Sequence, residues 1–329
     1  MRPLTAYLIK RVFLLVPVLL GITVIVFFLI HLIPGNPAVV MLGDQATPQA
    51  IARLDHELGL DQPMWLQFID YIGRLLQGNL GQSITESQSV VSLIAFALPN
   101  TLVLAVFAMV VALIIALPLG IASAVWRNSP LDFAGMVFAQ LGVSMPVFWL
   151  GTLLVEAFAL TWHIFPSFGL GAPVGTAFAA PFHGDAAPLA QLLAHMFLPG
   201  LTLGLTGAAL ISRMVRSAMV DVLGQDFIRT ARAKGVGESR VVLHHALRNA
   251  LVVVVTVVGL QFGFLLGGAV IVETIFAWPG MGRLTVNSIL ARDFPTVQGC
   301  ILVFAMMFAL VNLLVDMSYA VLDPKVHYE

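Results

Sequence analysis

The chain has 329 residues, of which 59% are hydrophobic and only 10% are charged, with a formal net charge of −1 at pH 7. A soluble domain carries about 25% charged residues, so this chain is too poor in charge to cover a water-facing surface of its size. It shows no basic nucleic-acid footprint, and its single cysteine excludes an intrachain disulfide. The composition therefore predicts an all-α integral membrane protein within a lipid bilayer.

The first apolar run covers residues 12–33, with His31 as its only ionisable side chain. A helix of that length reaches roughly 33 Å at about 1.5 Å per residue, enough to cross the hydrocarbon core. The run ends at the helix stop Pro34-Gly35-Asn36-Pro37 and has no small-residue cleavage site. We therefore expect a retained span and not a signal peptide.

Five further runs satisfy the same criteria of length and polarity. They cover residues 98–125, 133–160, 196–211, 250–272 and 300–321. Every backbone amide in hydrocarbon needs an internal partner, so each run is predicted to be a transmembrane helix. Small residues repeat every fourth position in the fifth span (Gly259, Gly263, Gly267) and in the fourth (Gly200, Gly204). This spacing predicts close helix packing, with approach of a ligand to bare backbone as the alternative.

The Lys and Arg residues set the expected orientation. If the N-terminus is cytoplasmic, 12 of the 16 lie on the cytoplasmic side. The four on the outer side are Arg53, Arg74, Arg283 and Arg292. This positive-inside bias predicts six spans with both termini in the cytoplasm.

These expectations divide the chain into consecutive segments. They are a cytoplasmic N-terminus (1–11), a first span (12–33), a periplasmic helical loop (34–97), a five-span core (98–322) with its inner loop at 213–249, and a cytoplasmic C-terminus (323–329).

The first outer loop is predicted to be helical. Thr47-Pro48 is typical of a helix start and Gly59 of a helix end. A second amphipathic stretch begins after Asp61-Gln62-Pro63 and stops at Gly78. We expect these helices to lie against the bundle or the membrane interface. Docking of an external partner is the alternative.

The inner loop 213–249 is rich in helix formers, breaks at Gly235-Val236-Gly237, and resumes as a helix over 238–247. Its apolar residues have no span to cover. They are Phe227, Ile228, Ala231, Val241, Val242 and Leu243. A short polar helix-turn-helix with an apolar stripe is suited to insertion into a groove of a partner. The alternative is an ordinary basic inner loop, because the cytoplasmic side retains positive charge in most membrane proteins.

The order of residues in this loop resembles a known family. Residues 226–235 (DFIRTARAKG) and 244–251 (HHALRNAL) resemble the EAA loop of ABC importer permeases, in the form of the dipeptide, oligopeptide and nickel branch. The general pattern has Glu-Ala-Ala where this chain has Arg229-Thr230-Ala231, and its closing motif is also replaced. Further segments are similar to that branch. They are YLIKR (7–11), IPGNP (33–37), LGLDQP (58–63), GNLG (78–81), ETIFAWPGMG (273–282) and LDP (322–324).

The resemblance implies a type I ABC importer permease fold in a bacterial inner membrane. It implies a second related permease, two ABC ATPase subunits and an extracytoplasmic substrate-binding protein. The chain has no phosphate-binding loop, so ATP and Mg are expected in the ATPase partners, with no catalytic, cofactor or metal site here. The implied ATPase-coupling residues are Asp226, Arg229, Thr230, Ala231, Arg232, Ala233, Lys234, Gly235, Gly237 and Glu238.

Polar residues in or near the spans are candidates for a translocation path. They are Gln140, Ser144, Glu156, Gln261 and Asp316. Interhelical hydrogen bonds explain the first two and Gln261 equally well, and Glu156 and Asp316 lie near span ends, where interfacial water is accessible.

Two other classes of protein are alternatives. An ion-coupled secondary transporter would show midplane charges and inverted repeats, and an intramembrane enzyme would need a nucleophile with its base or a set of metal ligands. Neither explains the loop around Gly235. The cargo stays open among dipeptide, oligopeptide, glutathione and a nickel complex.

Overall fold

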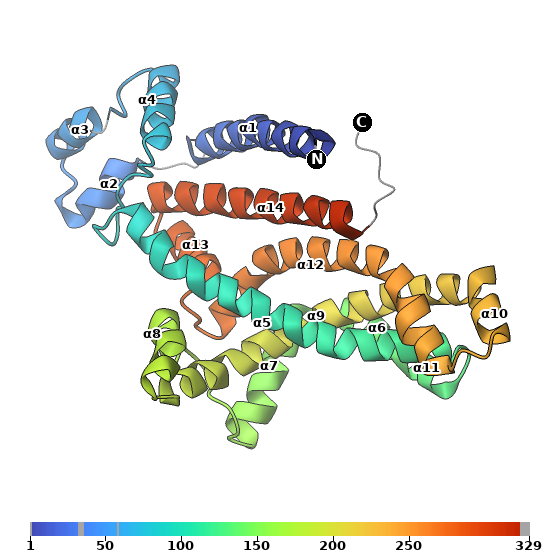
Figure 1. The fold of residues 1–329 in the computed structure, drawn as a ribbon. Helices are drawn as coiled ribbons and strands as arrows, with labels where there is room; N and C mark the ends of the chain where they lie inside the picture. The colour runs from blue at the N-terminus through green and yellow to red at the C-terminus, as the bar shows by residue number, and fades with distance from the viewer. Residues whose placement is uncertain (1, 32–35, 58, 323–329) are drawn as a thin grey trace.

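The computed structural model describes residues 2–31, 36–57 and 59–322, and these contain no β-strand (Figure 1). The helices are α1 (Arg2–His31), α2 (Pro37–Leu42), α3 (Pro48–Glu57), α4 (Met64–Leu76), α5 (Val90–Val125), α6 (Pro130–Ser144), α7 (Val147–Leu154), α8 (Val174–Ala179), α9 (Ala187–Leu223), α10 (Asp226–Ala233), α11 (Glu238–Arg240), α12 (Leu247–Ile275), α13 (Met281–Leu290) and α14 (Phe294–Leu322). Two π-helical segments, Val155–Thr161 and Val241–Ala246, follow α7 and α11. Predictions at Pro34-Gly35, Leu58 and 323–329 lie outside the described residues.

The long helices run along a common direction and reverse it from one to the next (Figure 1). Helices α3, α4, α8 and α13 lie toward one end of the bundle, and α10 and α11 lie at the opposite end. The first residues of α1 and the last of α14 are directed toward the end that carries α10 and α11. The loop 213–249 and both ends of the described chain thus lie toward the same end of the bundle.

Three described helices are long and apolar enough to cross a membrane. They are α5, α9 and the Phe294–Met317 part of α14. Two bent pairs pass the test when joined, Pro130–Ser144 with Val147–Thr161 and Glu238–Leu251 with Val253–Gly267. In α1 the apolar part is the shorter Phe13–Phe28. The all-helical class is confirmed, while the count of six spans stays a prediction.

The third predicted span, 133–160, is not one continuous helix. Helix α6 ends at Ser144, and the direction changes by 105° before α7. Proline at 146 lacks an N–H and disfavours helical backbone at the residue before it. Met145 accordingly has extended dihedrals, with φ −79° and ψ 125°. The expectation of an unbroken span was wrong here because it counted apolar residues and ignored Pro146.

Helix α9 is the centre of the bundle. The predicted fourth span, 196–211, lies inside this helix of 37 residues. A Cβ added at Gly200 would overlap the Phe107 ring, and one at Gly204 would overlap Val111, both from α5. The predicted close packing at these two glycines is confirmed, because only a bare Cα lets α5 approach so closely.

Helix α12 packs on α14 by the same principle. A Cβ at Gly259 would overlap Val315, and one at Gly263 would overlap Phe308. Gly267, in contrast, has nothing within 4 Å of the added Cβ. The predicted packing role is thus confirmed for two of these glycines and wrong for Gly267.

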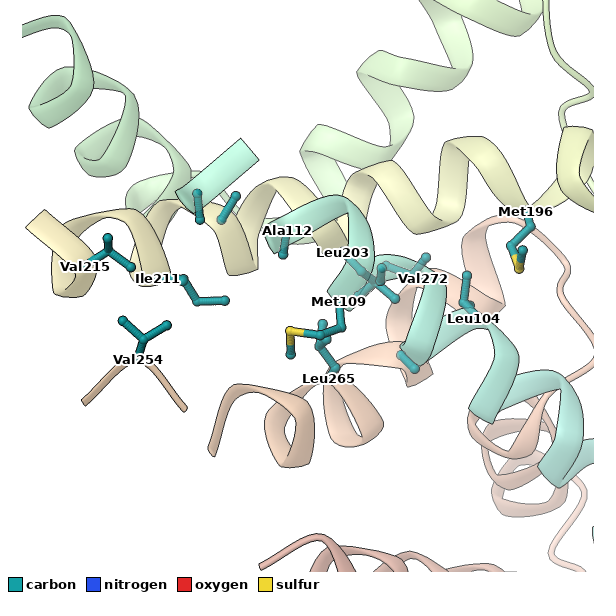
Figure 2. Close-up of a cluster of buried hydrophobic side chains, with 14 of the residues drawn as sticks. Leu104, Met109, Ala112, Met196, Leu203, Ile211, Val215, Val254, Leu265 and Val272 are labelled. Carbon is teal, nitrogen blue, oxygen red and sulfur yellow. The ribbon is translucent and has the colours of Figure 1, made fainter. Parts of the chain in front are cut away.

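The main apolar core lies among α5, α9 and α12, as Figure 2 shows. Its fully buried members include Leu104 of α5, Leu203 and Ile211 of α9, and Val272 of α12. Because lipid tails are as apolar as these side chains, the helices associate through van der Waals packing and the polar contacts described below.

The first outer loop folds as predicted from its caps. The Thr47 hydroxyl accepts a hydrogen bond from the Ala50 amide (3.2 Å) at the start of α3. Gly59 has φ +69° after the end of α3, and Gly78 has φ +74° after the end of α4. Tyr71 of α4 stacks on Phe27 of α1, with 5.6 Å between ring centroids. The second amphipathic helix therefore lies against the bundle, as expected.

A buried carboxylate holds this loop to α14. Asp293 accepts hydrogen bonds from the hydroxyl of Ser83 (2.5 Å), the amide of Ile84 (3.1 Å) and the hydroxyl of Thr85 (3.2 Å). It also accepts from the Thr296 hydroxyl (2.8 Å). Asp293 is thereby a clamp between residues 83–85 and the first turn of α14.

Replacing Asp293 with alanine is expected to release this segment. The hydrogen-bond donors left without their acceptor destabilise the closed state by about 2 kcal/mol. The population in which this segment is detached from α14 should therefore rise roughly 30-fold. Limited proteolysis of the purified protein should therefore cleave within residues 59–89 much faster in the variant than in the wild type. The control is Asp70→Ala, which removes an exposed carboxylate of α4. Equal cleavage of both variants would contradict the clamp.

Candidate functional site

The loop that follows α9 forms two short helices around a glycine turn. Helix α9 ends at Leu223, α10 ends at Ala233, and the turn has Gly235 at φ +76°. The Gly235 amide donates to the Arg232 carbonyl (2.9 Å) and the Val236 amide to the Ala231 carbonyl (3.2 Å). These are the two hydrogen bonds of a Schellman motif, which needs a left-handed residue at the glycine position. The predicted helix-turn-helix and its break are confirmed.

Apart from Ala231, which is partly buried against the core, the apolar stripe of this loop divides into two sets. Ile228, Val241 and Val242 are buried in the core of this chain, beside Met219 of α9. The expectation that the whole stripe is free for a partner was therefore wrong. These three side chains anchor the turn to the end of α9.

Phe227 and Leu243 form the other set, with 40% and 59% of their surface exposed. They lie on either side of the Gly235 turn in sequence. Exposed large apolar side chains beside a rigid turn are the anchors that a groove in a partner recognises.

A salt bridge crosses the turn. Arg232 donates from Nη2 to Glu238 Oε1 (2.6 Å) and from Nε to Oε2 (3.1 Å), which joins α10 to α11. This fork holds the pKa of the Glu238 carboxyl below its usual value. Asp226 and Arg229 form a further exposed pair at 3.2 Å, and Thr230 bonds the Asp226 carbonyl (3.0 Å). Ala233 and Lys234 are exposed.

Glu238→Gln is expected to weaken transport only a few-fold. Both partners are about half exposed, so the pair is worth about 0.2–1 kcal/mol. The pKa of Glu238 is lowered in the folded chain, so the pair is complete above the usual carboxyl pKa of about 4.3 and is lost as pH falls through the lower folded value. Transport should thus show no Glu238-dependent change between roughly pH 5 and pH 8. The charge-swapped double variant should recover activity, and its failure to do so would argue that the pair has no role.

A buried ion pair joins the start of α6 to α9. Arg216 donates to Asp132 through Nε (2.5 Å) and Nη2 (2.8 Å), and the Asp132 side chain is 1% exposed. The Asn128 amide also donates to Asp132 (2.9 Å). This pair was not predicted from the sequence. The signal was an acidic residue three positions after the cap Ser129, at the start of a helix otherwise without charge.

The predicted path residues do not meet in one place. Gln140 donates to Ser144 (3.1 Å) and lines a cavity of about 270 Å³ between α5, α6 and α9. Asp316 lines another cavity, of about 570 Å³, between α1, α12 and α14. Gln261 lies beside Gly207 of α9, and Glu156 is exposed on the π-helical segment. A single polar path through this chain is thus not formed by these five residues.

The segment 273–282 forms a buried network with α5 that sequence analysis left without a role. The Thr101 hydroxyl and the Arg283 amide donate to Glu273 at 2.6 and 3.0 Å. Trp278 donates from Nε1 to the Asn100 carbonyl (3.0 Å), and Asn100 donates to the Pro279 carbonyl (2.7 Å). The network fixes the corner between α12 and α13.

Two glycines of this segment are required by the network. A Cβ at Gly280 would overlap the Glu273 carboxylate, and one at Gly282 would overlap the backbone of Val270. Glu273 is completely buried, so its oxygens depend on these protein donors.

Comparison with known proteins identifies the class of the molecule. Residues 116–328 match the family "Binding-protein-dependent transport system inner membrane component", and residues 4–105 match its N-terminal counterpart. The chain belongs to this family, whose members are the multi-pass inner-membrane components of ABC importers.

Its relatives match over almost the whole length. The chain is 45% identical to the dipeptide transport system permease protein DppB of Alkalihalophilus pseudofirmus, over 98% of this chain and 99% of that protein. It is 44% identical to the glutathione transport system permease protein GsiC of Salmonella typhimurium, with the same coverage of 98% and 99%.

The fold is also found in solved structures. A chain of the inward-facing MetNI methionine ABC transporter superposes with a TM-score of 0.56 at 16% identity, over 70% of this chain and 96% of that chain. A second crystal form gives a TM-score of 0.53 at 17% identity, over 71% and 97%. This likeness confirms the ABC importer permease fold.

Proposed function

We propose that the chain is the permease subunit of an ATP-driven importer of short peptides. The observation that carries the proposal is the identity of 45% and 44%, over 98% of the chain, to permeases named for dipeptide and glutathione transport. Dipeptides and glutathione share peptide bonds and a free carboxylate, so a short peptide is the substrate class common to both. A nickel complex has no support from these relatives.

The family to which the chain belongs supports a set of separate partner subunits. ATP hydrolysis takes place in two separate ABC ATPase subunits, and a related second permease completes the translocation path. An extracytoplasmic binding protein delivers the peptide at the end of the bundle that carries α3, α4 and α8. The positive-inside bias and the proposed ATPase contact around Gly235 both place residues 213–249 and the two termini on the cytoplasmic side.

Coupling takes place at the turn between α10 and α11. Phe227 and Leu243 enter a groove of an ATPase subunit. When that subunit moves, the buried side chains of Ile228, Val241 and Val242 transmit the movement to α9 and α12. The Arg232–Glu238 salt bridge keeps the two short helices together as the ATPases close.

Site-specific crosslinking tests the proposed ATPase contact. A photo-crosslinking residue at Leu243, which is exposed, should capture an ATPase subunit with a phosphate-binding loop in native membranes. The same residue at Val242, which is buried beside it, is the matched control and should capture none. Purification in mild detergent should then recover the ATPase, the second permease and the binding protein. A chain that purifies alone, with no ATPase crosslink from position 243, would refute the proposal.

A further inference from the structure

Helix α4 has two apolar faces, and the bundle covers only one of them. Phe68, Tyr71 and Leu75 share one face, because they are separated by three and four residues. This face packs against Phe27 of α1 and Leu302 of α14. Helix α4 is thereby joined to two of the long helices of the bundle.

The second apolar face is exposed. Trp65, Ile69 and Leu76 follow one another at four and seven residues and thus form one stripe along α4. Their exposed fractions are 62%, 56% and 83%. Asp70 and Arg74 lie away from this stripe, and both are exposed as well. A helix with an exposed apolar stripe and an exposed polar face is suited to the boundary between water and an apolar phase.

Helix α4 also has the orientation and the level of a helix at a membrane surface. It runs across the direction of the long helices, at the end of the bundle that carries α3 and α8 (Figure 1). Its contact residue Phe27 is the last but one residue of the apolar part of α1, Phe13–Phe28. The covered face of α4 therefore holds the helix at the level where the apolar surface of α1 ends.

The exposed stripe continues an apolar surface of α1. Ile25 and Phe28 of α1 are exposed, and Phe28 lies beside Phe68 of α4 with 6.2 Å between ring centroids. Helix α3 of the same loop lies farther from α1 (Figure 1), and its apolar residues Ile51 and Leu54 are half-buried. The exposed stripe is thus a property of the helix next to α1 and not of the whole loop.

We propose that α4 is an interfacial anchor, whose stripe of Trp65, Ile69 and Leu76 lies among the headgroups and upper acyl chains of one lipid leaflet. Tryptophan suits this level because its ring is apolar and its indole N–H is polar. Asp70 and Arg74 stay in water. The anchor holds the end of α1 and the loop that follows it at the membrane surface. The inference concerns a lipid contact, so it goes beyond the proposed function and is independent of the cargo.

The accessibility of nitroxide labels along α4 tests the anchor. The single cysteine of the chain, Cys300, is buried, and wild-type complex treated with the same reagent gives the background signal. Labels are attached to Ile69→Cys and Leu76→Cys on the stripe, and to Asp70→Cys and Arg74→Cys as matched controls on the polar face. The complex purified through this chain is placed in phosphatidylcholine nanodiscs. Collisions of each label are measured with oxygen, which partitions into lipid, and with a water-soluble nickel chelate.

The ratio of oxygen to chelate collisions should be several-fold higher at positions 69 and 76 than at positions 70 and 74. Equal ratios at all four positions would place the stripe in water and overturn the proposal. Labels at 69 and 76 that meet neither reagent would assign the stripe to a contact with another permease subunit. Loss of collisions at these positions only after an external binding protein is added would assign it to that protein. Either of these last results would also overturn the lipid anchor, and each would leave the proposed function standing.

Discussion

Gly235→Val is expected to lower ATP-driven uptake at least tenfold while leaving the permease inserted and its ATPase partners bound. Gly235 adopts φ +76°, a conformation that costs a residue with a Cβ about 1–2 kcal/mol, with more for a β-branched side chain. A Cβ at this position would meet nothing within 4 Å, so the whole effect arises from the backbone. Relief of the strain opens the Schellman turn and changes the angle between α10 and α11. Uptake should fall at least tenfold, roughly the effect of 1.4 kcal/mol, and basal ATP hydrolysis should continue.

The neighbouring Gly237→Ala variant is the matched control. Gly237 has φ −58° and open space around an added Cβ, so alanine is tolerated. Uptake and hydrolysis are measured together in proteoliposomes, with membrane insertion checked by yield. A Gly235→Val importer that still couples hydrolysis to uptake would show that the shape of this turn is not what transmits the movement.

Glu273→Ala is expected to be the most destabilising substitution of the transmembrane core. The carboxylate is fully buried, and its removal deprives the Thr101 hydroxyl and the Arg283 amide of their acceptor. Each buried donor left unsatisfied costs about 1–3 kcal/mol, so we expect a loss of about 3 kcal/mol in the free energy of unfolding. The corner between α12 and α13 should open first, because Trp278 and Asn100 depend on the same geometry.

Denaturant titration in mixed micelles measures this effect. Glu156→Ala removes an exposed carboxylate and should change the free energy of unfolding by no more than about 0.5 kcal/mol. Glu273→Gln keeps the side-chain shape and one acceptor oxygen, so its cost should fall between the two. A Glu273→Ala permease as stable as the Glu156→Ala control would contradict the account of the buried network.

Local features of the fold were predictable from the sequence because their causes are local. The Thr47-Pro48 start, the Gly59 and Gly78 ends and the Gly235 turn depend on residues within one helical turn. The break at Met145-Pro146 was equally local, and the prediction missed it by counting apolar residues alone.

Long-range pairs were not predictable in this way. Thr101 and Glu273 are separated by 172 residues, and Asp132 and Arg216 by 84. Nothing within either segment of such a pair indicates which distant residue it will meet. The division of the apolar stripe also depends on contacts between distant segments. Ile228 and Phe227 are adjacent large apolar residues, and only packing against α9 makes one of them buried and the other exposed.

The central claim is that this chain imports short peptides with energy from ATP, and reconstituted uptake tests it most directly. The complex purified through this chain is placed in proteoliposomes with ATP enclosed on the side of residues 213–249, and the binding protein and labelled dialanine are added to the other side. We expect accumulation that requires ATP and persists when ionophores remove all ion gradients. Accumulation that needs an ion gradient and proceeds without ATP would contradict the claim and identify an ion-coupled secondary transporter.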